Sequence, residues 1–492
     1  MADEVTNKLV DGAAAREFLQ KTKEHLDQKS PADHHHDDRY YQKQETDAKV
    51  GAVKDALDVH ILRSTTWCGC RWRLDSLSTE GEPVGSLVKI EKMASIFGLG
   101  GYLITNDHER AKLSAEDHNY LENGQPAVLD GSAGHYQWGS NCDIYYAHWK
   151  DDVYEYEALD VVPIPGHQNI CFPAFSRSCA GFAAIDRTNL VLMSCINKTE
   201  QFRGGTNQAA WDGTWRSLLG KPATNINVAT VVTYARKNGT LWFVNERAVF
   251  FLTGVIKRIF FHNRDIQAEL NPTLTADNLH QGGTGMGVDM HPNWEATGDL
   301  AYNPYIDLDA GLELGDYTGV FSVTGLNKLD EEITLGGIPS FLGLKNDYHY
   351  LWAMTEDELL ANNTDKTQSM YIDDDIDGHV FDRAGIAGHT LIGTTPPNKN
   401  WQFIKEMQLD HACMVPVAIG ASETTGWADG YYNPASGNTS LRGALRLGSA
   451  GYAGQAGSGF LYGYYAPSTA YANGGFALCE FKRAFSTKPA WY

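Results

Sequence analysis

The sequence lacks any hydrophobic run long enough to cross a membrane. A spanning helix needs about 20 consecutive apolar residues, whereas the longest apolar stretches, such as 248–256, are about half that length. Residues 1–10 also lack the apolar core that a secretion signal requires. We therefore expect no membrane insertion, and we expect the protein to be synthesised in a cytoplasm.

Basic residues are scarce. The chain has 40 Lys and Arg against 61 Asp and Glu, which gives a net charge of -21. A surface this acidic repels phosphate backbones, so nucleic acid is excluded as an expected partner. The 42% share of hydrophobic residues still supports a folded core, and the length of 492 residues predicts about two to four structural units.

Closely spaced cysteine pairs of the CxxC type are absent, although the chain has eight cysteines. Cys68 and Cys70 are too close together for a usual zinc site. Without a secretion signal, we expect these thiols to be buried and reduced. The short regular repeats of a parallel β-helix are also missing.

Two short helical patterns occupy the N-terminal part of the sequence. Residues 11–28 have helical spacing of apolar residues after Asp11, a candidate N-cap. Residues 46–60 follow the a/d spacing of a helical seam. We predict a short α-helical segment over 1–60, and its seam favours oligomerisation. The seam positions are Val50, Val53, Leu57 and His60.

The pattern changes at about residue 61. Short apolar runs separated by Gly, Asn and Asp clusters predict an α+β body over 61–492 with many short strands and long loops, opened by a β-rich lead-in over about 61–160. The long apolar segment 241–270 has no proline and predicts the main helix of the body. The predicted strands lie at 72–74, 102–105, 190–196 and 228–235.

Residues 33–47 carry a His-x-His-Asp-Asp-Arg-Tyr-Tyr run, followed by polar residues. This run resembles a linker motif of bacteriophage tail-fibre proteins, and residues 9–26 resemble the short leader of such fibres. The resemblance implies a homotrimer. It makes His34 and His36 candidate ligands for a transition metal at the trimer axis, because six imidazoles from three chains complete an octahedron. The alternative is a solvated turn.

Four segments of the body, 265–288, 427–434, 442–457 and 475–479, resemble the C-type-lectin-like fold of phage receptor-binding proteins, including targets of diversity-generating retroelements. In that family an Arg-x-x-x-Arg-x-Gly-Ser start and a Gly-Phe finish are scaffold positions. Ala477 replaces the usual arginine after Gly-Phe. The resemblance implies a C-type-lectin-like body. The matching residues are Arg442, Arg446, Gly448, Ser449, Gly475 and Phe476.

Small and aromatic residues crowd the segment 444–479. Tyrosine offers a large contact area with only two side-chain torsions to fix, so a surface of Tyr, Ser, Gly and Asn binds at low entropic cost. We predict a ligand-binding surface here; the alternative is that half of these aromatics fill a core. The candidate contact residues are Trp427, Tyr431, Tyr432, Tyr452, Gln455, Phe460, Tyr462, Tyr464, Tyr465 and Tyr471.

An acidic loop is a second candidate for metal binding. Asp373, Asp375 and Asp377 stand where a calcium loop places its first three ligands, and Gly378 follows as the turn residue. The twelfth position is Ala384 rather than glutamate, so an EF-hand is incomplete. The alternative is a solvated acidic surface.

No catalytic arrangement stands out. Formylglycine-generating enzymes use two cysteines close in sequence, whereas Cys413 and Cys479 are far apart. A dyad of Cys413 with His411 is a weak candidate, because neighbours in sequence seldom form one. A polysaccharide depolymerase needs two carboxylates roughly 5–10 Å apart, and the sequence nominates no pair. We therefore expect a protein that is not an enzyme.

Together these patterns favour a phage virion protein of the fibre or receptor-binding class, placed on the tail or capsid surface. Residues 1–60 are expected to contact other virion proteins, and the body is expected to bind a bacterial surface glycan or protein. One alternative is a structural head fibre, capsid or baseplate decoration protein without receptor binding. The other is an enzyme of the formylglycine-generating or depolymerase type.

Overall fold

The chain divides into two compact units, Met1–Thr66 and Trp67–Tyr492. All helices and strands of the described residues belong to the second unit. The predicted helices at 11–28 and 46–60, together with His34 and His36, lie outside the described residues. The computed structural model describes residues 66–204, 209–214, 217–271, 305–326, 331–397, 400–433, 438–471 and 473–492.

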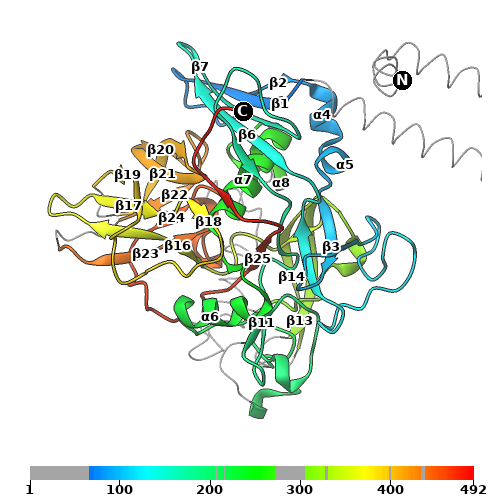
Figure 1. The fold of residues 1–492 in the computed structure, drawn as a ribbon. Helices are drawn as coiled ribbons and strands as arrows, with labels where there is room; N and C mark the ends of the chain where they lie inside the picture. The colour runs from blue at the N-terminus through cyan, green and yellow to red at the C-terminus, as the bar shows by residue number, and fades with distance from the viewer. Residues whose placement is uncertain are drawn as a thin grey trace, which may run out of the picture. The chain divides into compact units, whose positions relative to one another are not determined.

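The second unit is β-rich with few helices (Figure 1), as strand residues make up 38% of the structure and helical residues 14%. This confirms the expected abundance of short strands. Among the described residues, no helix is long and apolar enough to cross a membrane. The short helices are α4 (Leu87–Glu91), α5 (Met93–Phe97), α8 (Ile266–Leu270) and the 3-10 turns η1 (Glu200–Phe202), η2 (Ala209–Trp211), η3 (Arg236–Asn238), η5 (Leu312–Leu314) and η6 (Ala450–Gln455).

Helix α7 (Arg247–Phe261) is the central helix of the unit, and its residues up to Ile259 are all buried. A helix that is apolar on every side is stable only when it is surrounded by protein. The prediction of one helix over 241–270 is correct for this central part. It is wrong at both ends, because residues 242–244 form strand β12 and a break at His262 separates α7 from α8.

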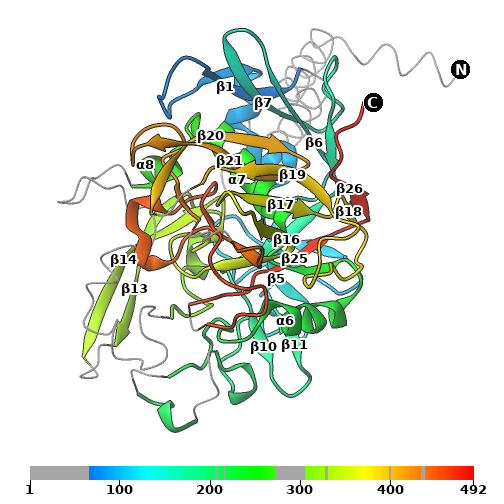
Figure 2. The same ribbon diagram turned by 90° about the vertical axis from the view of Figure 1, so that its left-hand side faces the viewer.

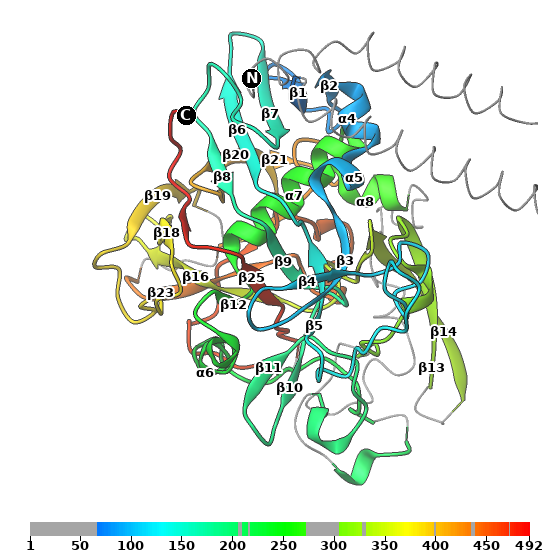
Figure 3. The ribbon, with the colours of Figure 1, turned by 45° about the vertical axis from the view of Figure 1, so that its right-hand side comes forward.

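A five-stranded and a six-stranded sheet lie beside α7 (Figure 3). Strand β25, near the C-terminal end of the described residues, pairs with β9 and β12, so early and late segments share one sheet. The first sheet has the order β2 (Glu82–Gly85), β1 (Cys68–Arg73), β7 (Tyr154–Asp160), β6 (Ile144–Lys150), β8 (Ile170–Phe172). The second has the order β12 (Trp242–Val244), β25 (Leu478–Phe481), β9 (Phe175–Ser178), β5 (His135–Gly139), β3 (Gly100–Ile104), β4 (Arg110–Lys112).

An eight-stranded sheet contacts α7 through β16 and β21 (Figure 2). Its order is β19 (Thr390–Thr395), β17 (Gln368–Ile372), β16 (Ala353–Asn362), β23 (Leu441–Arg446), β24 (Leu461–Tyr462), β22 (Gly430–Tyr432), β20 (Gln402–Asp410), β21 (Cys413–Ala421). Smaller sheets pair β13 (Gly319–Leu326), β14 (Glu332–Phe341) and β15 (Leu344–Lys345), β10 (Ala184–Asp186) with β11 (Val191–Met193), and β18 (Asp375–Ile376) with β26 (Phe485–Ser486).

Three buried ion pairs join α7 to the strands and loops around it. Arg247 Nε lies 2.9 Å from Asp357 of β16, and Lys257 Nζ lies 2.5 Å from Asp347. Arg258 binds Glu157 of β7 through two nitrogens, at 2.8 and 2.7 Å. A buried charge is tolerated when it is paired and hydrogen-bonded. These charged residues therefore fix the position of α7 against the strands and loops around it.

Helix α6 (Val228–Ala235) overturns the strand predicted at 228–235. Its buried residues are Val228, Val231, Val232 and Ala235. These positions follow the helical repeat of three and four residues, so one face of the helix packs on the core. The β-branched residues suggested a strand, but tertiary burial overrides that weak preference.

The N-cap of α6 gives a direct test of this assignment. The Asn227 side chain accepts a hydrogen bond from the Thr230 backbone N–H at 2.9 Å. We expect Asn227→Ala to lower the free energy of unfolding by about 1 kcal/mol, because the helix loses this cap. Denaturant unfolding measures the change, with Asn227→Ser as the conservative control. Equal loss in both variants would contradict the role of the cap.

Candidate functional site

Aromatic side chains from separate loops and strands meet around strand β24 of the eight-stranded sheet. We name this group the aromatic cluster. Tyr462 lies at its centre, with its ring 4.9 Å from Trp352 and 5.5 Å from Trp401. Chains of ring contacts continue outward, as between Tyr465 and Tyr471 at 4.9 Å. The members are Trp352, Trp401, Tyr432, Tyr452, Phe460, Tyr462, Tyr464, Tyr465 and Tyr471.

The sheet topology brings these rings together. Strands β22 and β24 pair in parallel, with Tyr432 opposite Tyr462. Their rings stack at 5.0 Å with an interplanar angle of 16°. Strand β23 lies on the other side of β24 and places Leu445 opposite Tyr462. The centre of the cluster is therefore fixed by backbone pairing rather than by loop conformation.

The aromatic cluster has a buried base and an exposed rim. At the base, Phe460 is 0% exposed and Tyr462 is 9% exposed. Burial raises the pKa of Tyr462, so its hydroxyl stays protonated at neutral pH. At the rim, Tyr464 is 47% exposed. The half-buried rim residues are Trp401, Tyr432, Tyr452, Tyr465 and Tyr471.

Four of the predicted contact residues are buried, which corrects their assignment as surface contacts. Trp427 is 1% exposed, and the Arg258 and Arg264 guanidinium groups lie 4.9 and 4.8 Å from its ring centroid. Tyr431 is fully buried and donates a hydrogen bond to the Pro396 carbonyl. These two rings therefore belong to the core rather than to a contact surface. The other two are Phe460 and Tyr462.

Gln455 is half-buried, and the glycines near it serve close packing. A Cβ on Gly430 would lie 2.8 Å from the Gln455 Cβ. A Cβ on Gly463 would lie 2.2 Å from the Gln368 side-chain oxygen. The small residues of this segment therefore leave space for neighbouring side chains. Trp401, which precedes β20, was missed by the sequence analysis because nothing in its local sequence connects it with residues 452–471.

The acidic loop does not form the predicted calcium site. His379 lies between two of the carboxylates, with its Nδ1 2.5 Å from Asp377 and its other nitrogen bonded to Asp373. The hydrogen bond to Asp377 raises the pKa of His379. Asp375 instead belongs to strand β18, opposite Ser486. Within the described ranges, no three His, Cys, Asp or Glu side chains gather closely enough to hold a metal ion.

The cysteines confirm the prediction of reduced thiols. All eight are free, and all except Cys142 are buried. Cys413 and His411 do not form a dyad, since the Cys413 thiol donates to Glu358 at 3.3 Å while His411 binds Asp374 at 2.5 Å. Burial raises the pKa of the Cys413 thiol well above its ordinary value. This thiol is therefore a poor nucleophile.

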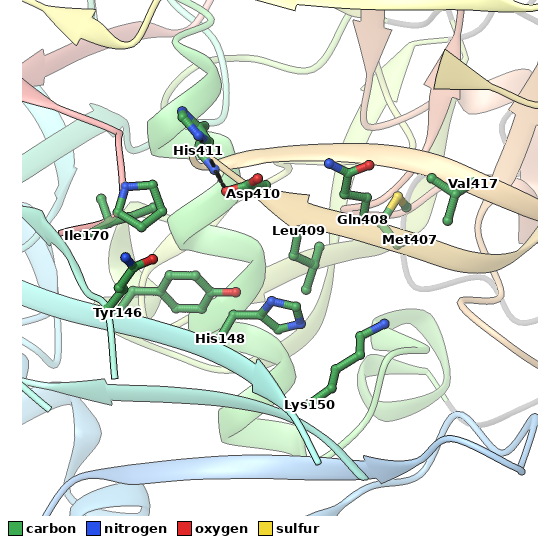
Figure 4. A pocket seen from close by; sticks show the side chains of 12 residues that line it. Tyr146, His148, Lys150, Ile170, Met407, Gln408, Leu409, Asp410, His411 and Val417 are labelled. Carbon is green, nitrogen blue, oxygen red and sulfur yellow. Dashed lines mark hydrogen bonds and ion pairs between the residues drawn. The ribbon is translucent and has the colours of Figure 1, made fainter. Parts of the chain in front are cut away.

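A pocket of about 390 Å³ lies at the opposite end of strand β20 from Trp401. Tyr146, His148 and Lys150 reach it from one face of β6, where alternate residues point the same way. Figure 4 shows these side chains pointing toward the β20–β21 hairpin, with Leu409 pointing back at His148. Asp410 closes the hairpin side of the pocket. Sequence analysis missed this pocket because its walls come from distant segments.

The β6 wall of the pocket carries excess positive charge. Glu155 accepts from His148 at 2.9 Å, from Lys150 at 3.1 Å and from Arg264 at 2.6 Å. Burial opposes ionisation of Glu155, but the His148 hydrogen bond and the Arg264 charge outweigh it and hold its pKa well below the usual range. The single negative charge of Glu155 therefore stands against two positive charges, those of Lys150 and Arg264, and one positive charge remains unbalanced.

The hairpin wall carries excess negative charge. His411 Nδ1 lies 2.5 Å from Asp374, and its Nε2 lies 3.6 Å from Asp410. The Asp374 hydrogen bond raises the pKa of His411. Even when His411 is protonated, two carboxylates face one imidazolium. The pocket is thus cationic on one side and anionic on the other.

Comparison with known proteins gives no information on the function of the aromatic cluster or of the pocket. No protein-family model matches the chain, and no curated protein sequence matches it. The arguments for function therefore rest on the geometry of the aromatic cluster and of the pocket.

Proposed function

We propose that this chain is a phage fibre or receptor-binding protein of the virion, and that the rim of the aromatic cluster contacts the bacterial surface. In this proposal the second unit has a C-type-lectin-like fold. The N-terminal segment attaches the protein to other virion proteins and supports a homotrimer. Two observations support this fold. Arg446 is buried and binds Glu358 at 2.5 and 3.1 Å, and Gly448 has a positive φ of 76°.

The observation that carries the proposal is the layered arrangement of the cluster. Tyr464, Tyr465 and the other rim rings rest on a buried base of Phe460 and Tyr462. A ring held in place by its neighbours loses little conformational freedom when a partner binds. Exposed aromatic side chains that are surrounded by well-packed residues also commonly contribute most of the binding energy of an interface. The rim is therefore suited to adhesion.

Several copies on one particle would strengthen a weak contact. Joined binding sites convert later binding events into intramolecular ones and raise avidity by about 10²–10⁴ without new contacts. A homotrimer displayed on a virion supplies this arrangement. The structure therefore does not need to provide a deep pocket for tight attachment at the rim.

Competition for adsorption tests the proposed function. Purified full-length protein is incubated with host cells, phage particles that carry the protein are added, and unadsorbed particles are counted. We expect wild-type protein to block adsorption. The double variant Tyr464→Ala/Tyr465→Ala is expected to need at least about tenfold more protein for half-blocking, because rim tyrosines contribute more than 1.4 kcal/mol together. Tyr462 is left intact because it supports the base.

The matched control is Tyr120→Ala. Tyr120 is 45% exposed, close to the 47% of Tyr464, but does not belong to the aromatic cluster. This variant is expected to block adsorption as well as wild type does. If folded wild-type protein leaves adsorption unchanged, the receptor-binding role is wrong and the structural decoration function replaces it.

A further inference from the structure

The pocket beside β6 and the β20–β21 hairpin is separate from the aromatic cluster. Strand β20 has nine residues, so its two ends lie roughly 30 Å apart. Trp401 precedes the strand, and Asp410 is its last residue. A ligand in the pocket therefore does not touch the rim, and the inference does not depend on the proposed adhesion function.

The charged groups define the two ends of a ligand that fits the pocket. At the β6 wall, Lys150 is half exposed and shares Glu155 with Arg264 and His148, so its ammonium group retains unused donors. A carboxylate is the complementary group, since charge-assisted hydrogen bonds are the strongest available. At the hairpin wall, the Asp410 carboxylate is 44% exposed and can accept hydrogen bonds from hydroxyl groups of a ligand.

The space between these ends is partly apolar and partly hydrogen-bonding. Leu409, Val417 and Ile170 provide aliphatic surface, and Gln168 provides an amide. A sugar ring has this same combination, with an apolar C–H face and a rim of hydroxyl groups. The volume of about 390 Å³ is in the range of small-molecule sites.

We propose that this pocket binds a sugar unit that carries a carboxylate. The sugar carboxylate binds Lys150, its hydroxyl groups bind Asp410 and the Gln168 amide, and its C–H face packs on Leu409 and Val417. The carboxylate is the deciding group, because a neutral sugar leaves the positive wall without a partner. An acidic polysaccharide and a free uronic acid share this chemistry.

Binding of matched sugar pairs tests the proposal. D-glucuronate and D-glucose differ only in the carboxylate, as do D-galacturonate and D-galactose. Affinities for the full-length protein are measured by isothermal titration or saturation-transfer NMR. We expect at least one uronate to bind about tenfold or more tightly than its neutral partner, because one charged hydrogen bond is added. Displacement by polygalacturonate then distinguishes a polymer unit from a free sugar.

Variants at exposed positions locate the binding. Lys150→Gln is expected to reduce uronate affinity about tenfold, to the level of the neutral sugar. Val417→Trp fills the pocket and is expected to abolish binding of both sugars, and Val417 is 40% exposed, so folding is little affected. The control Lys405→Gln removes an exposed lysine of β20 that does not line the pocket. It is expected to bind as wild type does.

Three results would overturn the proposal. The first is absence of binding by both uronates at millimolar concentration. The second is equal affinity for the acidic and neutral sugars. The third is an uronate preference that survives both Lys150→Gln and Val417→Trp, because binding would then occur elsewhere on the protein.

Discussion

Replacing Arg258 by methionine is expected to lower the free energy of unfolding by about 3–5 kcal/mol, because Glu157 would remain buried without its partner. Both side chains of this pair are essentially inaccessible, at 0% and 1% exposure. The guanidinium group also lies over the Trp427 ring, 4.9 Å from its centroid. Urea unfolding of the wild type and the variant measures the difference.

Two further variants separate the ion pair from general loss of packing. The double variant Arg258→Met/Glu157→Leu is expected to recover most of the lost stability, since no unpaired charge remains. Arg71→Met is the control. Arg71 also binds a glutamate through two nitrogens, at 2.9 and 2.7 Å from one oxygen of Glu82, but on the surface. It is expected to cost less than about 1 kcal/mol. Similar losses for Arg258→Met and Arg71→Met would contradict this account.

Lowering the pH from 7 to 5 is expected to remove about 4 kcal/mol of stability through His135 and His349. Burial lowers the pKa of each imidazole from 6.5 to about 3. Below pH 6.5 the unfolded chain takes up protons that the folded chain excludes. The contribution is therefore complete above pH 6.5 and is lost progressively as the pH falls toward 3. At pH 5 each histidine accounts for about 2 kcal/mol.

The pH dependence of a double variant isolates this effect from other buried groups. Unfolding free energies of wild type and His135→Gln/His349→Gln are compared at pH 7 and pH 5. Buried carboxylates titrate in both proteins, so their contributions cancel in the difference. We expect the decrease between the two pH values to be about 4 kcal/mol smaller in the variant, and about 2 kcal/mol smaller in each single variant. An equal decrease in all four proteins would show that the histidines are not responsible.

Local patterns predicted some elements well and misassigned others for identifiable reasons. The apolar run at 241–270 contains α7 because an apolar segment of that length must be buried. Its ends were misassigned because β12 is fixed by pairing with β25, a strand more than 200 residues later. Helix α6 was predicted as a strand because β-branched residues were given more weight than their helical spacing.

The sequence predicted most of the residues that gather in the aromatic cluster, but not which of them are buried and which are exposed. The sequence concentrates tyrosines in 452–471, and the structure does bring them together with Tyr432. Which rings face solvent depends on the parallel pairing of β22 with β24 and on Trp401, neither of which has a local signal. The pocket beside β6 was not predictable at all, because β6 and the β20–β21 hairpin are more than 250 residues apart.

The sequence by itself determined the acidic character of the protein, its reduced cysteines, its strand-rich body and the position of its central helix, because composition and local periodicity control these properties. Only the tertiary structure decided which aromatic residues form the core and which form a rim, where the buried charges find partners, and where a pocket opens. Those features depend on contacts between segments far apart in the chain, and a buried position is defined by its neighbours rather than by its own residue type.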